Sequence, residues 1–218
     1  MNSPEKWLNL GPAELALQEE ARALGASVAG IAAEADAMSE IHPGMRTALR
    51  ESGLAALMVP ASYGGRNPDV DPLAVCIVRE ALMRASSHLD SMFALQGIGS
   101  YAITRGGTDE QKAHWLPKVA SLESLAALAL TEEQAGSDLK NVATTVVEKN
   151  GELVVTGAKS FISNAGAADF YVTLVKEEAG LSLVLVPADA PGVSTSPSPE
   201  LIAPHVLGEI VFDDVVLP

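Results

Sequence analysis

The sequence predicts an α+β fold in which an all-helical domain, residues 1–122, precedes a mainly antiparallel, barrel-like β domain, residues 123–218. Two properties of the chain change together near Leu122. Before it, Ala and Leu recur at helical spacing, whereas after it β-branched residues alternate with polar ones. The first part holds ten basic and fourteen acidic residues, and the second holds four and fourteen, so the net charge is −4 in the helical part and −10 in the β part.

The composition predicts a folded chain with a sizeable core. Of its 218 residues, 48% are hydrophobic, and the mean hydropathy is +0.21. A net charge of −14 argues against nucleic acid or an anionic membrane as a partner. Cys76 is the single cysteine, the four histidines lack the spacing of metal ligands, and no stretch reaches the ~18 apolar residues of a membrane span. We therefore expect no metal site, no membrane span and a location in the reducing cytoplasm.

The first helices are predicted from proline positions and apolar spacing. Pro12 suits the first turn of a helix, and apolar residues then recur on one face from Leu17 to Ile31. Pro43 opens a shorter helix that ends near Gly53. About five helices are expected in this part of the chain.

Capping signals predict the remaining helices. Asp71 precedes a proline and opens a helix over 72–85, and a further helix is expected over 88–104. Thr108 and Gln111, three residues apart, form the pattern of a capping box.

Short strands with turn residues between them predict the β domain. Asn150-Gly151 lies between two such strands and is a strong hairpin signal, because both turn positions require positive φ. A second hairpin is expected to turn at 177–180, and the Pro/Ser-rich segment 189–204 is interpreted as a loop. The predicted strands cover 142–148, 152–156, 170–176, 181–186 and 210–213.

Two segments are candidates for a functional site. The first, LALTEEQAGSDLKNV (128–142), taken by itself, is a strand that ends in an acidic turn, and solvation alone would explain its charges. The second, GAKSFISNAGAADFYVTLV (157–175), is a strand with Phe161 and Ser163 that runs into a turn. Residue type alone predicts that Phe161 packs in the core.

Together these segments resemble the flavin-binding middle domain of the acyl-CoA dehydrogenase family, in which the usual forms are TEPxAGSD and GxKx[FW]I[ST]N. VPASYGG (59–65) and GGTDEQKAHWLPKVAS (106–121) resemble the helical domain of that family, and EIVFDDVVLP (209–218) resembles its ELxFDDVxVP strand. The similarity covers nearly the whole chain in colinear order.

The resemblance implies an FAD site. Leu128, Leu130 and Thr131 match positions that pack and hydrogen-bond the flavin ring in the family. Phe161 matches the aromatic residue that stacks beside the flavin, and Ser163 matches a hydroxyl that contacts it. Donors at these positions would stabilise the negative charge that develops as the ring accepts hydride.

The resemblance also implies a substrate and partners. The expected reaction is α,β-dehydrogenation of an acyl thioester, of coenzyme A or an acyl carrier protein. Ser137 matches a serine that contacts the pantetheine or phosphate portion, and Gly136 allows a close backbone approach. The acyl cavity is expected near 92–99. An electron-transfer flavoprotein as electron acceptor and a homo-oligomer of the full-length protein are further implications.

The chain departs from the family pattern at three places. Glu133 replaces the proline of TEPxAGSD, and the GxRxSDT pattern is missing near His205, which we expect to be structural or solvated. The chain stops at Pro218, where the family continues into a second helical domain that carries the catalytic glutamate. We therefore expect the base to lie outside this chain, with neither Glu132 nor Glu133 serving as base, and the chain alone to be inactive.

Several alternatives stay open at the level of sequence. One is a non-catalytic scaffold that binds flavin or an acyl thioester, and another is a flavin oxidase of the same superfamily. The net charge disfavours the DNA-associated relatives. An acyl carrier protein is acidic, so it would require a basic patch; the candidate residues for one are Arg46, Arg50, Arg66, Arg79 and Arg84.

Overall fold

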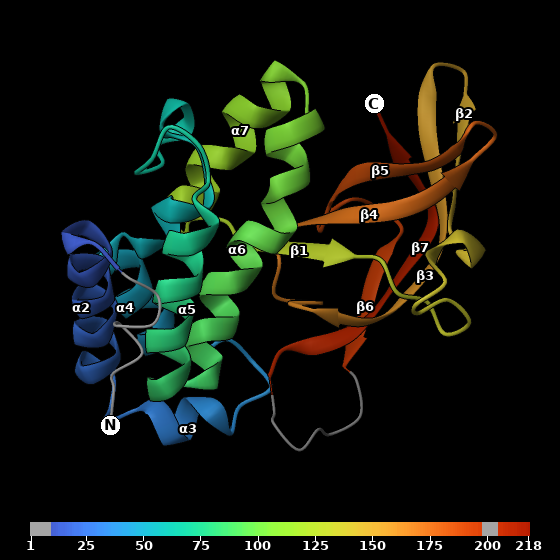
Figure 1. Ribbon diagram of the computed structural model, residues 1–218. Coiled ribbons are helices and arrows are strands. Elements are labelled where there is room, and N and C mark those ends of the chain that lie inside the picture. The colour runs from blue at the N-terminus through green and yellow to red at the C-terminus, as the bar shows by residue number, and fades with distance from the viewer. Residues whose placement is uncertain (1–9, 198–204) are drawn as a thin grey trace.

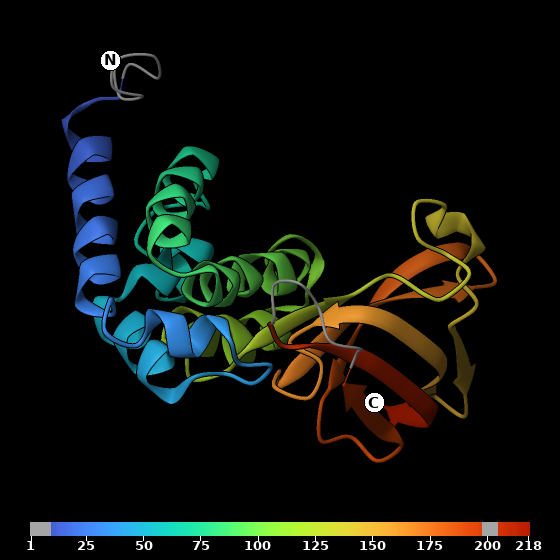
Figure 2. The same ribbon diagram turned by 90° about the horizontal axis from the view of Figure 1, so that it is seen from below.

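The computed structural model describes residues 10–197 and 205–218. Helices and strands form two lobes that lie side by side, with strand β1 crossing from one to the other (Figures 1 and 2). None of the helices in the described ranges is long and apolar enough to cross a membrane. The helical lobe contains α2 (Pro12–Ser27), α3 (Ala32–Asp36), α4 (Pro43–Ser52), the short 3-10 helices η1 (Leu54–Met58) and η2 (Ala61–Tyr63), α5 (Pro72–Ala85), α6 (Ser87–Gly106) and α7 (Asp109–Ala120).

Most helix ends follow the predicted local signals. The Asp71 carboxylate accepts from the backbone N–H of the second helical residue of α5 at 2.9 Å, and Thr108 and Gln111 form the expected capping box. Gly53 ends α4 in the left-handed conformation. The first long helix is shorter than predicted: α2 ends at Ser27, and Ile31 caps the separate helix α3.

One curled, mainly antiparallel sheet forms the second lobe, so the predicted fold class is confirmed. Its strand order is β1-β4-β2-β3-β7-β6, with β5 paired to the other edge of β4; β1 and β2 run parallel to β4. The strands are β1 (Ala126–Ala129), β2 (Thr145–Lys149), β3 (Glu152–Ser163), β4 (Phe170–Glu177), β5 (Gly180–Pro187), β6 (Val193–Pro197) and β7 (Leu207–Leu217), and the 3-10 helix η3 (Leu139–Asn141) lies between β1 and β2.

The β2–β3 hairpin confirms its sequence signal, because Asn150 and Gly151 have φ values of 58° and 86°. The loop predicted over 189–204 is partly wrong, since β6 lies within it and pairs with β7, while 198–204 lie outside the described residues. The domain boundary near Leu122 stays a prediction.

The two lobes meet where α6 crosses β1. Gly99 on α6 permits this approach, since a Cβ there would lie 2.6 Å from the Cβ of Ala126. The backbone N–H of Ala126 donates to Gln96, and its carbonyl accepts from Asn164. Side-chain amides from both lobes therefore hold the start of β1, which fixes the direction of the segment that follows it.

Candidate functional site

The segment that leaves β1 carries an open pair of hydrogen-bond donors. β1 is an edge strand, and Leu128, Leu130 and Thr131 at its carboxyl end are half-buried. The carbonyl of Thr131 accepts from the N–H of Ser160 at 2.9 Å. Neither the hydroxyl nor the N–H of Thr131 has a hydrogen-bond partner among the described residues. Two donors beside apolar side chains therefore remain available for a ligand.

A buried carboxylate organises the turn after Thr131. Glu132 and Ala135 exchange backbone hydrogen bonds of 3.0 and 3.1 Å. Glu132 is 4% exposed. Its carboxylate accepts hydrogen bonds from the backbone N–H of Ala143, from the backbone N–H and hydroxyl of Thr144, and from the Nζ of Lys159. Burial by itself would raise the pKa of Glu132, but these hydrogen bonds outweigh burial and lower it to about 2.

Lys159 is the partner of this carboxylate. It is fully buried, with its Nζ 2.7 Å from Oε1 of Glu132, and it also donates to the carbonyl of Leu130 at 3.1 Å. Its pKa is lowered because burial outweighs the pairing with Glu132. The interpretation of Glu132 as a solvated turn residue is wrong. A lysine in the middle of a strand that is otherwise partly apolar was the available signal for this ion pair.

Phe161 is turned out of the sheet by a local irregularity. Its φ is 56°, and the pairing of β3 with β7 shifts register between Lys159 and Ile162. In a regular strand residues 159 and 161 would share a face. Here Lys159 is buried, whereas Phe161 is 61% exposed, so core packing predicted from residue type is wrong. A strained, exposed aromatic residue of this kind is typical of a functional site.

The remaining predicted residues are Ser163, on the same strand as Phe161, and Ser137 with Gly136, in the loop after Thr131. Ser163 is half-buried opposite Leu207 of β7, and its hydroxyl has no hydrogen-bond partner in the described part of the chain. Ser137 and Gly136 are exposed, and a Cβ on Gly136 would have no atom within 4 Å. The structure thus joins Thr131 to the strand that carries Phe161 and places Ser137 in the same loop, open to solvent.

Comparison with known families fits this arrangement. Residues 11–123 match the family model described as "Acyl-CoA dehydrogenase, N-terminal domain", and residues 127–215 match "Acyl-CoA dehydrogenase, middle domain". The chain belongs to the acyl-CoA dehydrogenase family. The resemblance predicted from its motifs is confirmed.

Individual members of the acyl-CoA dehydrogenase family align with nearly all of this chain. Cyclohexane-1-carbonyl-CoA dehydrogenase of Geobacter metallireducens is 30% identical over 197 residues, which cover 88% of this chain and 52% of that protein. A glutaryl-CoA dehydrogenase structure from Mycobacterium smegmatis is 27% identical with a TM-score of 0.86, covering 96% of this chain and 55% of that one. An acyl-CoA dehydrogenase structure complexed with FAD, from Bacillus anthracis, is 26% identical with a TM-score of 0.84, and the alignment covers 100% of this chain and 38% of that one. The chain spans about half the length of the curated relatives it matches.

An apolar groove lies in the helical lobe. It has a volume of about 360 Å³ and lies mainly between α5 and α6. Ala94, Gly97 and Ile98 of α6 line it, so the groove overlaps the region 92–99 that was predicted for the acyl cavity. Arg79 also lines the groove and forms an ion pair with the buried Asp90.

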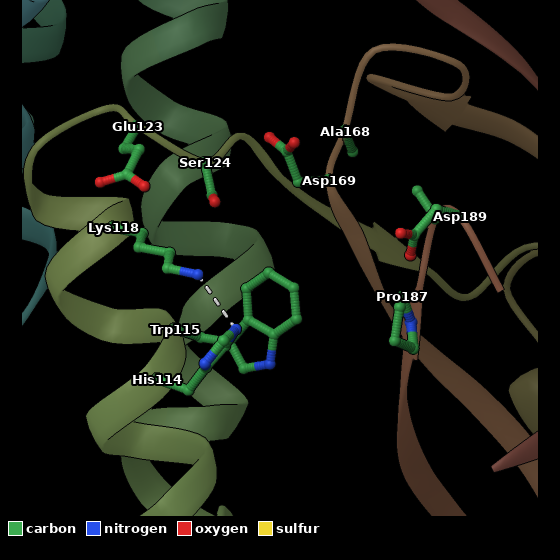
Figure 3. A pocket seen from close by; sticks show the side chains of 10 residues that line it. His114, Trp115, Lys118, Glu123, Ser124, Ala168, Asp169, Pro187 and Asp189 are labelled. Carbon is green, nitrogen blue, oxygen red and sulfur yellow. Dashed lines mark hydrogen bonds between the residues drawn. The ribbon is translucent and has the colours of Figure 1, made fainter.

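A more polar cavity of about 600 Å³ lies between α7 and the strands β4 and β5 (Figure 3). Trp115 and Lys118 face Asp169 and Asp189 across it, and the Nζ of Lys118 is 3.1 Å from Nε2 of His114. It opens where β4 begins, whereas Thr131 follows the carboxyl end of the parallel strand β1. The lining includes none of the residues predicted to contact the flavin or the substrate, namely Leu128, Leu130, Thr131, Ser137, Phe161 and Ser163.

Proposed function

We propose that this chain provides the helical and middle domains of an FAD-dependent dehydrogenase that forms the α,β double bond of an acyl thioester. The observation that carries the proposal is the pair of unpartnered Thr131 donors, tied through Ser160 to the strand on which Phe161 is exposed. Apolar side chains, an aromatic ring and free donors together suit a flat, polar-edged ring such as a flavin. The FAD complex of the Bacillus anthracis relative supports this choice.

Each predicted site residue would have a separate role toward the flavin. Bound FAD would supply the hydride acceptor. Leu128 and Leu130 would pack against the flavin ring, and Phe161 would stack beside it. The hydroxyl and N–H of Thr131 would stabilise negative charge developing on the ring, and Ser163 would add a further hydrogen bond.

The substrate is proposed to be an acyl-CoA. The apolar groove between α5 and α6 would receive the acyl chain, while Ser137 and the open backbone at Gly136 would contact the pantetheine or phosphate portion. The arginines considered for an acyl carrier protein already have intramolecular partners, which favours coenzyme A. Arg66, Arg79 and Arg84 pair with carboxylates, and Arg46 and Arg50 donate to backbone carbonyls.

Glu132 is unsuited to remove the α-proton. It is buried and paired with Lys159, and its pKa of about 2 makes it a weak base. We infer that the base lies outside these 218 residues. We propose an electron-transfer flavoprotein as the electron acceptor and a homo-oligomer as the state of the full-length protein.

The test is a titration of the purified chain with FAD, followed by anaerobic addition of butyryl-CoA. We expect weak FAD binding and no bleaching of the flavin absorption by the thioester. A chain that binds no FAD would contradict the proposed function, and it would favour a scaffold. Bleaching by butyryl-CoA would contradict only the inference that the base lies elsewhere.

Thr131→Val is expected to raise the dissociation constant for FAD roughly tenfold, since a hydrogen bond to the ring contributes about 1 kcal/mol or more. Valine keeps the shape of threonine and removes its hydroxyl. Fluorescence titration measures the change, and Thr131→Ser, which keeps the hydroxyl, is the control. Equal affinities for the Thr131→Val variant and the wild-type chain would remove Thr131 from the flavin site.

Phe161→Gly is expected to weaken FAD binding about threefold to tenfold while the free energy of unfolding changes by less than about 1 kcal/mol. The loss of stacking reduces affinity. Stability is nearly kept, because relief of the left-handed backbone offsets the added chain entropy of glycine. Urea unfolding and FAD titration measure the two effects, with Phe161→Tyr as the control. A large loss of stability would show instead that Phe161 packs in the core.

A further inference from the structure

The two motifs around the proposed flavin site are joined by a buried ion pair. The Lys159 and Glu132 side chains are 0% and 3% exposed, and their charged atoms are 2.7 Å apart. A buried ion pair adds little to stability compared with well-packed apolar residues, because desolvation offsets the attraction. A contribution to stability therefore explains poorly why charged residues occupy this position. Their effect on the geometry of the neighbouring backbone explains it better.

Lys159 fixes the orientation of one peptide group. Its Nζ donates to the carbonyl of Leu130, and this carbonyl belongs to the same planar peptide as the N–H of Thr131. In a trans peptide these two groups point in opposite directions, so holding the oxygen also aims the N–H. The next peptide is held by the hydrogen bond from Ser160 to the carbonyl of Thr131. Consecutive residues of β3 thus set the direction of the free Thr131 donor.

Glu132 fixes Lys159 in turn. Three further hydrogen bonds anchor the carboxylate: the N–H and hydroxyl of Thr144 donate to Oε1 at 3.0 and 2.6 Å, and the N–H of Ala143 donates to Oε2 at 2.5 Å. Thr144 lies close to Gly157 of β3: a Cβ atom on Gly157 would be 2.6 Å from the Cα of Thr144. The ammonium group therefore has one defined position, which a flexible, solvated lysine would lack.

The backbone of β3 places Lys159 and Phe161 on opposite faces. Because Lys159 is held inward, a regular strand would also turn the side chain two residues later inward. The register shift and the left-handed φ of Phe161 reverse this, and its ring is exposed. An inward Lys159 and an outward Phe161 are thus two parts of one backbone arrangement.

We propose that Lys159 and Glu132 are positioning residues that aim the N–H of Thr131 at the flavin ring. This inference rests on the proposed function. Neither residue needs to touch the ring: Lys159 acts through the Leu130–Thr131 peptide, and Glu132 acts through Lys159.

The decisive variant is the double substitution Lys159→Met and Glu132→Gln, which removes both charges and leaves no unpaired ion in the core. We expect it to fold, as shown by circular dichroism, and to bind FAD at least about tenfold more weakly than wild type. The visible absorption spectrum of any bound flavin should also differ from that of wild type, because the donor at the ring edge is no longer aimed. Leu49→Ala is the matched control, since it removes a fully buried side chain in the helical lobe and lowers stability without touching this segment. Leu49→Ala should keep the wild-type affinity and spectrum at temperatures where it is folded.

The outcomes separate this inference from the proposed function. If wild type binds FAD and the folded double variant has the same affinity and spectrum, the positioning role is overturned while the flavin site stands. If wild type binds no FAD, the proposed function fails and the inference fails with it. If the double variant does not fold, the single variant Glu132→Gln takes its place, because it keeps the side-chain volume and releases Lys159. FAD affinity and the flavin spectrum are measured in the same way. A weaker and spectrally altered complex supports the proposal, and an unchanged complex overturns it.

Discussion

Gln96→Leu is expected to lower the free energy of unfolding by about 4 kcal/mol, measured by urea denaturation. Gln96 is fully buried, and its Nε2 donates to the carbonyls of Val119 and Ser124 at 3.1 and 2.8 Å. Its Oε1 accepts from the N–H of Ala126 at 3.1 Å. Leucine has a similar size but leaves the Ser124 carbonyl and the Ala126 N–H without a partner, at about 1–3 kcal/mol each. The Val119 carbonyl still accepts from the N–H of Leu122.

The matched control is Gln18→Leu. Gln18 is also a buried glutamine in the helical lobe, but its amide has no hydrogen-bond partner among the described residues. The same chemical change should therefore alter stability by less than about 1 kcal/mol or increase it. Equal losses at both positions would show that side-chain packing, and not the junction of α6 with β1, determines the effect at Gln96.

The helix ends and the first hairpin could be predicted because their causes are local. The Asp71 cap, the Thr108 capping box and the Gly53 terminus each depend on side chains within a few residues of the helix end. Asn150-Gly151 likewise meets the φ requirement of its own turn. Such signals hold in any fold that the remainder of the chain adopts.

Strand β6 could not be predicted in this way. Val193–Pro197 is rich in serine and proline and is mostly exposed, so its composition is that of a loop. It forms a strand because β7, more than ten residues further along, offers hydrogen-bonding groups at the edge of the sheet. A strand that forms because of its pairing partner cannot be recognised from its own residue types.

The candidate site likewise has a part that local sequence predicts and a part that depends on distant residues. Thr131 and Phe161 were singled out by motif, but the link between them depends on a contact across 27 positions, from Glu132 to Lys159. Alternation along β3 also misplaces Phe161, because a bulge reverses the face on which it lies. Periodicity assumes regular pairing, and functional sites are where regular pairing is most often broken.

The second large effect is a loss of stability in acid that depends on Glu132. Its pKa is about 2 in the folded chain against 4.5 as the ordinary value, so the unfolded chain binds the proton more tightly. The lowered pKa therefore stabilises the fold above about pH 5, by about 3 kcal/mol, and this contribution is lost as the pH falls from 5 toward 2.

Glu132→Gln isolates this contribution, because glutamine cannot titrate. Other carboxylates with lowered pKa values, such as Asp36, affect both proteins equally. Urea unfolding at pH 7, 5 and 3 should therefore show a stability gap between wild type and Glu132→Gln that narrows as the pH falls. Parallel pH profiles would mean that the hydrogen bonds to Glu132 do not lower its pKa in the folded chain. Such a result would remove the anchor of Lys159, and with it the physical basis for a fixed Thr131 N–H.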